Sequence, residues 1–492
     1  MKALYNCYLS VSLLLGMFIF SACNGFLDME PSNASNSENA IGTTSDAQVI
    51  INGIMRAMTF SSYYGRNFIM YGDTKGGDLT IMAQGRGLDA MYTFNHSATS
   101  GTYSGFWTQG YNCIMQINNL LENIDKLEAK GDTGYDSYKG QALTLRGLIY
   151  FDLVRLYGLP YNYKKDSYGV PLVIQTLSAD AQPTRASVND IYKQILSDLS
   201  AGATLLSSNK SLNNGYISYY GNLAEQARVK LYMEDYDGAL KAAKEVIDSG
   251  KFKLYTPSQW VASWATQFGS ESIFELGIYP NEGDLETSSL GFYLMREGQK
   301  NGAAGWFMAS DYFLSRLGED NTDVRWGVMA QDESTTTHLG SCYKYLGGVG
   351  LTGDGKESMT AVNIKVIRLS EIYLIAAEAE LHTSTPDASK AAEYLNAIRC
   401  RAPKLALASA STITDDMILD ERSKELFGEG QRFFDMIRMN KSIIYNDDSG
   451  GIAVTQRPKT IDRTFGKIVL PISQDEINAN PALKDEQNDA YK

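Results

Sequence analysis

The sequence predicts a mainly α-helical fold, in which helix-turn-helix pairs form a scaffold for long irregular loops and a few short strands. Two observations lead to this expectation. Apolar residues recur with the helical period in segments spread along the chain, and several segments begin with capping signals or end with stop signals. Between them, about residues 60–106 and 255–365 are rich in Gly, Tyr, Thr, Ser and Asn and show few helical periods. Because long loops in a compact domain usually carry function, we expect the functional site there.

The helices are expected, in chain order, at residues 45–58, 106–127, 138–158, 187–200, 222–250, 368–383, 387–402 and 415–441. The segment 222–250 predicts two helices that meet near Glu234 and Asp235, and residues 273–279 predict a strand. Capping boxes are expected at Ser45 with Gln48, at Ser187 with Asp190 and, for a short final helix, at Ser473 with Glu476.

The paired helices, with alanine at close-contact positions, resemble tetratricopeptide repeats. Ala239 and Ala243 would let two neighbouring helices approach closely. The spacing of the pairs is uneven, so we expect a TPR-like scaffold of scattered helix-turn-helix pairs instead of a regular solenoid.

The first 40 residues predict export. Lys2 precedes an apolar run at 9–20, which is too short to span a bilayer as a helix. Small residues follow, as in a secretory signal peptide, and Cys23 stands where a bacterial lipobox has its acylated cysteine. We therefore expect residues 1–22 to be a lipoprotein signal peptide, Cys23 to carry lipid, and 23–40 to be a polar tether that is too poor in apolar residues to pack. The alternatives are a buried N-terminal helix and cleavage without lipidation.

The composition fits an exported globular protein. The chain has 492 residues and a net charge of −13, which argues against nucleic-acid binding because that needs basic patches. No linker-like tract divides residues 41–492, so we expect a single domain there.

Three cysteines follow Cys23 without metal-like spacing: Cys113, Cys342 and Cys400. We expect them to be small buried hydrophobes, and one disulfide remains an open alternative.

Several blocks of sequence form a recognisable series. They are LTLRGLIYFDLVRLYGLP followed by YGVPL, then RLSEIYLIAAEA, LNAIRCRA, ERSKELFGEGQRFFDMIR at 421–438, and a C-terminal block with LPIS, EI, NP and QN before Tyr491. In this order, the blocks resemble the SusD/RagB family of surface nutrient-binding lipoproteins. Gly428 departs from the family, which usually has an aromatic residue there, and the tail has extra residues before Gln487. The resemblance covers most of the chain after Cys23.

The resemblance implies a SusD-like fold and a lipid-anchored protein of the outer membrane. Such a protein captures oligosaccharides at the cell surface and passes them to a SusC-like TonB-dependent transporter, without catalysis. Three alternatives stay open: a peptide-binding RagB-type lipoprotein, a lipid-anchored hydrolase, and a purely structural lipoprotein. Handover to a transporter requires modest affinity, so we expect a dissociation constant of about 1 μM, which corresponds to about −8 kcal/mol.

The charges of the 421–438 block have a structural explanation. Arg422 with Glu425, and Arg432 with Asp435, stand at i,i+3 and can pair on a helix. We expect these charges to bind neighbouring loops and helix ends, and a catalytic role is disfavoured.

The sequence offers little that indicates catalysis or a cofactor. The three histidines show no metal spacing, and no nucleophile, zinc or P-loop motif is present. The segment GVGLTG at 348–353 matches a dinucleotide-binding pattern, but no amphipathic helix follows it. The stretch from Asp73 to Asp78 lacks the ligand order of an EF-hand, so a structural calcium ion is only an open alternative. Carboxylates are many, and nothing singles out a hydrolytic pair.

The aromatic residues of the irregular segments are the candidate ligand contacts. Sugar rings stack their C–H faces on aromatic side chains, and polar neighbours take the hydroxyl groups. By resemblance to the family, we assign stacking to Tyr92, Trp107, Tyr293 and Trp306, and polar contacts to Asp73, Arg86 and Asn95. For any single aromatic residue the competing explanation is core filling, to which we assign Trp260, Trp264 and Trp326.

Overall fold

The computed structural model describes residues 41–492 except 83–84, 86–87, 101–103, 213–214, 279–288, 297–302, 333–336, 346–362 and 448–451. Several features singled out from the sequence lie outside the described residues. They are the signal peptide at 1–22, the polar tether at 23–40 with the lipidation site Cys23, the candidate contact Arg86 and the glycine-rich segment 348–353.

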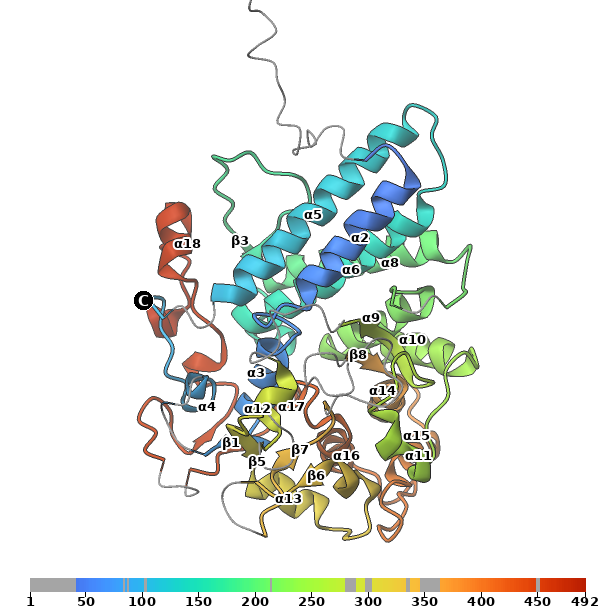
Figure 1. Ribbon diagram of the computed structural model, residues 1–492, viewed down its shortest axis with the longest axis vertical. Helices are drawn as coiled ribbons and strands as arrows, with labels where there is room; N and C mark the ends of the chain where they lie inside the picture. The colour runs from blue at the N-terminus through green and yellow to red at the C-terminus, as the bar shows by residue number, and fades with distance from the viewer. Residues whose placement is uncertain are drawn as a thin grey trace, which may run out of the picture.

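The structure confirms a mainly helical fold with a few short strands (Figure 1). The helices are α2 (Thr44–Met58), α3 (Asn67–Lys75), α4 (Asp89–Thr93), α5 (Ser104–Glu128), α6 (Asp136–Tyr157), α7 (Tyr161–Lys164), α8 (Val188–Leu206), α9 (Tyr219–Tyr232), α10 (Tyr236–Asp248), α11 (Pro257–Ser263), α12 (Leu290–Leu294), α13 (Asp311–Leu317), α14 (Leu369–His382), α15 (Ala388–Arg399), α16 (Asp415–Leu426), α17 (Arg432–Arg438) and α18 (Gln474–Ala479). No helix in the described ranges is both long and apolar enough to cross a membrane.

The described strands pair two by two, and every pair is antiparallel. The pairs are β1 (Leu79–Ile81) with β5 (Phe307–Ala309), β2 (Tyr168–Pro171) with β3 (Arg185–Ser187), β4 (Ser272–Leu276) with β8 (Ile364–Arg368), β6 (Met329–Ala330) with β7 (Ser341–Cys342), and β9 (Ile443–Ile444) with β10 (Thr460–Ile461). Strand β4 confirms the strand predicted at 273–279.

Helix pairs form the scaffold. In Figure 1, α2, α5, α6 and α8 form the upper end of the molecule, and α9, α10, α14 and α15 continue along one side. Helix α10 packs between α9 and α14, and its residues Ala239, Ala242 and Ala243 are buried at these contacts. Small side chains therefore let the helices approach closely, as the sequence predicted. Strands β1, β5, β6 and β7 with helices α12, α13, α16 and α17 fill the other end, whereas β2 and β3 pack against α6 and α8 (Figure 1).

Two of the three predicted helix starts are confirmed. Ser187 caps α8 and Ser473 caps α18, each accepting a hydrogen bond from the backbone N–H three residues later. The prediction for the first helix was wrong, because Thr43 caps α2 in a capping box with Asp46. Since Thr43 and Asp46 also have capping-box spacing, the sequence held two overlapping signals there.

The predicted helix 415–441 is broken into α16 and α17. Gly428 and Gly430 lie between them with φ angles of 78° and 79°, a conformation that glycine adopts without strain. At this turn the chain also approaches α3 closely, since a Cβ atom added to Gly72 would lie 1.9 Å from the carbonyl oxygen of Gly430. The break thus allows the 421–438 block to fold back against the N-terminal part of the chain.

The charges of the 421–438 block face the interior and form a buried network of ion pairs. Glu425 on α16 accepts hydrogen bonds from Arg401 at 2.6 Å and from Arg368 at 3.0 Å, and all three side chains are buried. Arg368 also binds Glu271 and Glu429. Because a buried charge is costly unless it is paired and hydrogen-bonded, this network requires all of its members.

The pairing within the block differs from the simple i,i+3 expectation. Arg422 binds Asp435 of α17 at 2.7 Å, and Arg432 lies 3.5 Å from Asp78. Asp435 also binds Arg438, which continues to Glu378 on α14. The expectation that these charges bind neighbouring elements is confirmed. The pair Arg422–Glu425 is replaced by a contact with α17, and the pair Arg432–Asp435 by a contact with Asp78 in the loop between α3 and β1.

The C-terminal segment packs back onto earlier parts of the chain. The backbone N–H of Gln474 donates to the carbonyl of Ala98, and Arg185 donates to the carbonyl of Glu486 at 2.5 Å. The hydroxyl of Tyr491 lies 2.9 Å from Nδ1 of His96. The other ring nitrogen of His96 lies 2.8 Å from the buried amine of Lys75, whose pKa burial holds well below its usual value. The tail is therefore part of the folded core.

The three described cysteines are free thiols. Cys113 and Cys342 are buried, as expected, and burial raises the pKa of Cys113 to about 12. The expectation of burial was wrong for Cys400, which is exposed at the C-terminal end of α15.

Replacing Glu425 by Gln should destabilise the protein strongly, by about 3–5 kcal/mol, because Arg401 and Arg368 would lose a buried counter-charge. Burial alone would raise the pKa of Glu425, but Arg401 and Arg368 outweigh it and lower the pKa to about 2. The contribution is therefore complete above the usual pKa of 4.5 and is lost as the pH falls through about 2. Urea unfolding at pH 7 measures the loss, with Glu393→Gln as the control in an exposed pair with Lys390. Equal stability of the two variants would contradict the assignment.

Candidate ligand-binding surface

Three aromatic rings of the second irregular segment form a cluster at α12 and β5. The rings of Tyr293 and Trp306 meet edge to face, with centroids 5.2 Å apart and an interplanar angle of 88°. Phe292 packs against both, at 5.4 Å from Tyr293 and 6.2 Å from Trp306. Tyr293 is buried, whereas Trp306 and Phe292 are only half-buried. The cluster thus holds one tryptophan firmly while part of its indole surface stays accessible.

The backbone fixes this tryptophan on a strand pair. Trp306 directly precedes β5, and its carbonyl accepts a hydrogen bond from the N–H of Met82, next to the end of β1, at 3.4 Å. In Figure 1, α12, β1 and β5 lie close to α3 on the side of the molecule that faces the viewer.

Arg66 adds a positive charge to the cluster. Its guanidinium carbon lies 4.8 Å from the ring centroid of Tyr293, and Nη1 donates to the Tyr293 hydroxyl at 3.3 Å. Its Nε donates to the side-chain oxygen of Asn67 at 2.8 Å. Burial lowers the pKa of the half-buried Arg66, and Tyr293 opposes this shift. The sequence did not single out Arg66, although it lies within the aromatic stretch SSYYGRNF.

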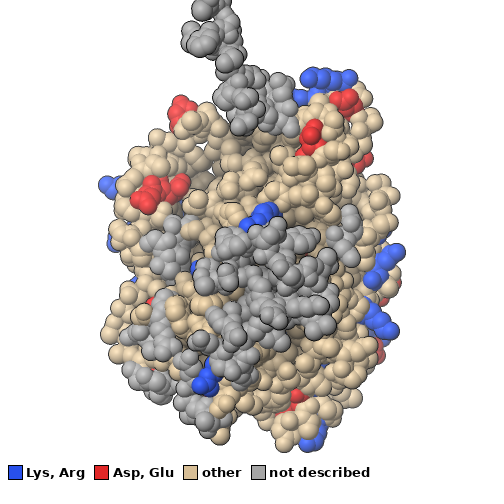
Figure 2. Space-filling model, viewed as in Figure 1, with Lys and Arg blue, Asp and Glu red and all other residues tan. Residues whose placement is uncertain are grey.

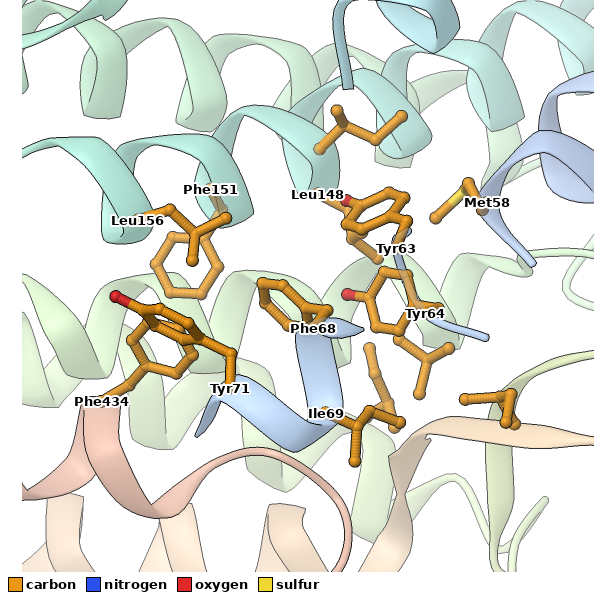
Figure 3. Packing of buried hydrophobic residues seen from close by; sticks show 14 of the residues in the cluster. Met58, Tyr63, Tyr64, Phe68, Ile69, Tyr71, Leu148, Phe151, Leu156 and Phe434 are labelled. Carbon is orange, nitrogen blue, oxygen red and sulfur yellow. The ribbon is translucent and has the colours of Figure 1, made fainter. Parts of the chain in front are cut away.

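Two tyrosines just before Arg66 fix its loop to the helical scaffold. The hydroxyls of Tyr63 and Tyr64 both donate to the same carboxylate oxygen of Asp152 on α6, at 2.5 and 2.7 Å, and Asp152 also binds Arg155. Figure 3 shows Tyr63 and Tyr64 together with Phe68 on α3, all directed toward α6. The loop between α2 and α3 is therefore tied to the helical scaffold directly before Arg66.

Comparison with known proteins decides the family. Residues 25–230 match the family described as "Starch-binding associating with outer membrane", and residues 271–491 match the SusD family. A SusD superfamily protein of Bacteroides thetaiotaomicron is 33% identical, and the match covers 91% of this chain and all of that one with a TM-score of 0.80. This chain belongs to the SusD superfamily. The resemblance drawn from the sequence blocks is thereby confirmed.

Two further relatives agree. A structure described as a putative sugar binding protein from Bacteroides vulgatus is 31% identical to this SusD-family chain, with a TM-score of 0.81 over 92% of it and all of the other chain. SusD-like protein P38 of Formosa agariphila is 25% identical over the full length of both chains.

Of the four residues assigned to stacking, two lie in the core of this SusD-family chain. Tyr92 is 0% exposed, donates its hydroxyl to Asp447 and is covered by the guanidinium of Arg457. Trp107 is 6% exposed and packs between Tyr111 and Tyr157. Neither ring has a free face for a sugar, so both fill the core. Only Tyr293 and Trp306 are brought together at one place.

The residues assigned to polar contacts do not join the cluster. Asn95 is exposed, but its neighbours Phe94 and His96 pack against Phe465 and Tyr491 of the C-terminal segment. Arg86 lies outside the described residues. Asp73 is buried near the end of α3 with 1% of its surface exposed.

Asp73 is a buried carboxyl group without a hydrogen bond of normal geometry among the described residues. Burial and the neighbouring Asp78 raise its pKa to about 8, and the nearby amides of Gly430 and Gly428 counteract this only in part. The group is thus largely protonated at neutral pH. The turn between α16 and α17 packs against α3 at Gly72 and covers Asp73, so this side chain does not face a ligand as its assignment to polar contacts required.

Catalytic machinery is not evident in the described ranges. A polar hollow lies where α9, α14 and α17 end, and it contains His382, bonded to Asp415 at 2.8 Å. Among the described residues no Ser, Thr or Cys side chain bonds to that histidine, so a hydroxyl or thiol nucleophile activated by it is not found there. Likewise, the described residues hold no group of three or more His, Cys, Asp or Glu side chains suited to a metal ion.

Replacing Asp73 by Asn should change the pH dependence of stability. The folded-state pKa lies above the usual 3.8, so the stabilising contribution of the protonated acid is complete below about pH 4 and is lost as the pH rises through about 8. A permanently neutral Asn should therefore raise the melting temperature relative to the parent increasingly from pH 4 to pH 9. Thermal unfolding across this range tests it, and a constant difference between the two proteins would refute it.

Proposed function

We propose that this protein captures oligosaccharides at the cell surface through the Trp306–Tyr293 cluster and passes them to a SusC-like TonB-dependent transporter. It acts by binding alone, without catalysis. Acylation of Cys23 anchors it in the outer membrane, since an acyl chain contributes about 0.8 kcal/mol per buried CH₂ group.

The observation that carries the proposal is the half-buried indole of Trp306, held edge to face by Tyr293. A pyranose ring has faces of C–H groups, which pack on an aromatic plate with little loss of hydration. Because the plate is already fixed by the ladder between β1 and β5, binding does not have to order it, and this lowers the entropic cost.

The relatives support the same ligand class. One family description names starch binding and association with the outer membrane, and the B. vulgatus relative is described as a sugar binding protein. Handover to a transporter favours modest affinity, and an open aromatic plate with few polar contacts fits a dissociation constant in the micromolar range.

Substituting Trp306 by Ala should abolish or weaken oligosaccharide binding at least tenfold, since stacking on an aromatic ring is worth about 1.5 kcal/mol or more. Calorimetry with a panel of plant, host and microbial glycans, with casein peptides alongside, identifies the ligand and measures the loss.

The matched control is Tyr168→Ala, which removes an exposed ring near Arg185, outside the cluster. Its affinity should equal that of the parent. Unaltered glycan binding by a folded Trp306→Ala variant would contradict the proposal, binding of peptides alone would favour the RagB-type alternative, and turnover of any glycan or peptide by the purified protein would show an enzyme.

A further inference from the structure

Arg66 is a half-buried cation without a carboxylate partner among the described residues. Its two hydrogen bonds go to a hydroxyl, that of Tyr293, and to an amide oxygen, that of Asn67. A guanidinium carries five N–H groups, so the remaining ones are left without a partner in the described part of the chain. Five buried arginines elsewhere in the described chain bind carboxylates, namely Arg146, Arg228, Arg325, Arg368 and Arg401. The buried Arg185, which has no ion pair with a described residue, is instead surrounded by carbonyl and amide oxygens.

A second arginine of this loop-rich part of the chain also lacks a described counter-charge. Arg296, two residues after α12, donates to the carbonyl oxygen of Asp332 and likewise forms no ion pair with a described carboxylate. In Figure 2, the acidic side chains visible in this view lie mostly toward its margins, and a few Lys or Arg side chains appear between them.

We propose that the site recognises a sugar that carries a negative charge, either a carboxylate or a sulfate. The anionic group pairs with Arg66 while the sugar ring stacks on Trp306. This inference rests on the proposed function and specifies its ligand class. A planar guanidinium forms paired hydrogen bonds to either anion, and partial burial strengthens them because water screens the charges less.

The geometry makes Arg66 a specificity residue. Tyr293 contacts both the guanidinium and Trp306, so one ring holds the cation and the indole close to each other. The loop that carries Arg66 is fixed through Tyr63 and Tyr64 to Asp152, so the charge stands in place before a ligand arrives. A neutral sugar would leave the cation half-buried and unpaired, which disfavours it.

The test compares each anionic probe with its neutral counterpart by calorimetry on the mature chain at low salt. One pair is tetragalacturonate and its methyl ester; the other is a sulfated galactan tetrasaccharide and its desulfated form. At least one anion should bind tenfold or more tightly than its counterpart, as expected for a charge-assisted hydrogen bond. The pair that shows the difference identifies carboxylate or sulfate as the recognised group.

Arg66→Gln should remove this preference and change the affinity for the neutral probe by less than about threefold. Arg66→Lys, which keeps the charge, should retain part of the preference and remains informative if the Gln variant does not fold. Arg463→Gln, which removes a charge stacked on Tyr163, is the control with the same net charge.

Three results would overturn the inference. A neutral probe that binds as well as its anionic counterpart refutes it and leaves the proposed function standing. A preference that survives in a folded Arg66→Gln variant places the recognition elsewhere. If neither the probes nor the neutral glycan panel bind, the inference and the proposed function both fail.

Discussion

The buried ion pairs around α16 are the constraint on which the rest of the structure depends. Glu425 and Glu429 bind Arg368, which joins strand β8 to helix α14, and Glu425 also binds Arg401 after α15. Lys344, from the loop-rich part, binds Glu429 in the same network. Each charge lost water on burial, so only a complete set compensates the cost, and such a network favours one arrangement of the chain over others. The ion pairs thereby hold the helix pairs and the irregular segments in one fixed arrangement.

Buried polar contacts of the same kind explain how irregular loops can hold the candidate site residues in fixed positions. The loop after α2 has no regular structure, yet Asp152 of α6 ties down both of its tyrosines. The aromatic residues of α12 rest on β5, and β5 is paired with β1, which directly follows α3. The scaffold thus transmits its rigidity to Arg66 and Trp306 through buried side chains. A surface for capturing ligands needs this pre-arrangement more than it needs a deep cavity.

Local patterns in the sequence predicted what depends on local interactions. The helical period gave α5, α6, α8 and the pair α9–α10, and the serine caps of α8 and α18 were recognisable because capping acts over three residues. The burial of individual aromatic side chains could not be predicted from such local patterns. Tyr92 and Tyr293 are the same residue type in similar irregular surroundings, and only contacts distant in the chain, with Asp447 for one and Arg66 for the other, separate core from site. Arg66 was missed for the same reason, since its role depends on a tyrosine 227 positions away.

Helix α2 also has a mechanical consequence. Its 15 residues extend roughly 22 Å from the tether side at Thr44 to the loop that carries Arg66, and it packs along α5 for that length (Figure 1). A pulling force on an anchored N-terminus enters the domain at the first turn of α2 and is resisted as shear along the α2–α5 contact. The loop at the other end is clamped to α6, so tension is absorbed before it reaches the aromatic rings. Under the proposed anchoring, tension on the N-terminus would therefore leave the loop with Arg66 and the aromatic rings of α12 in place.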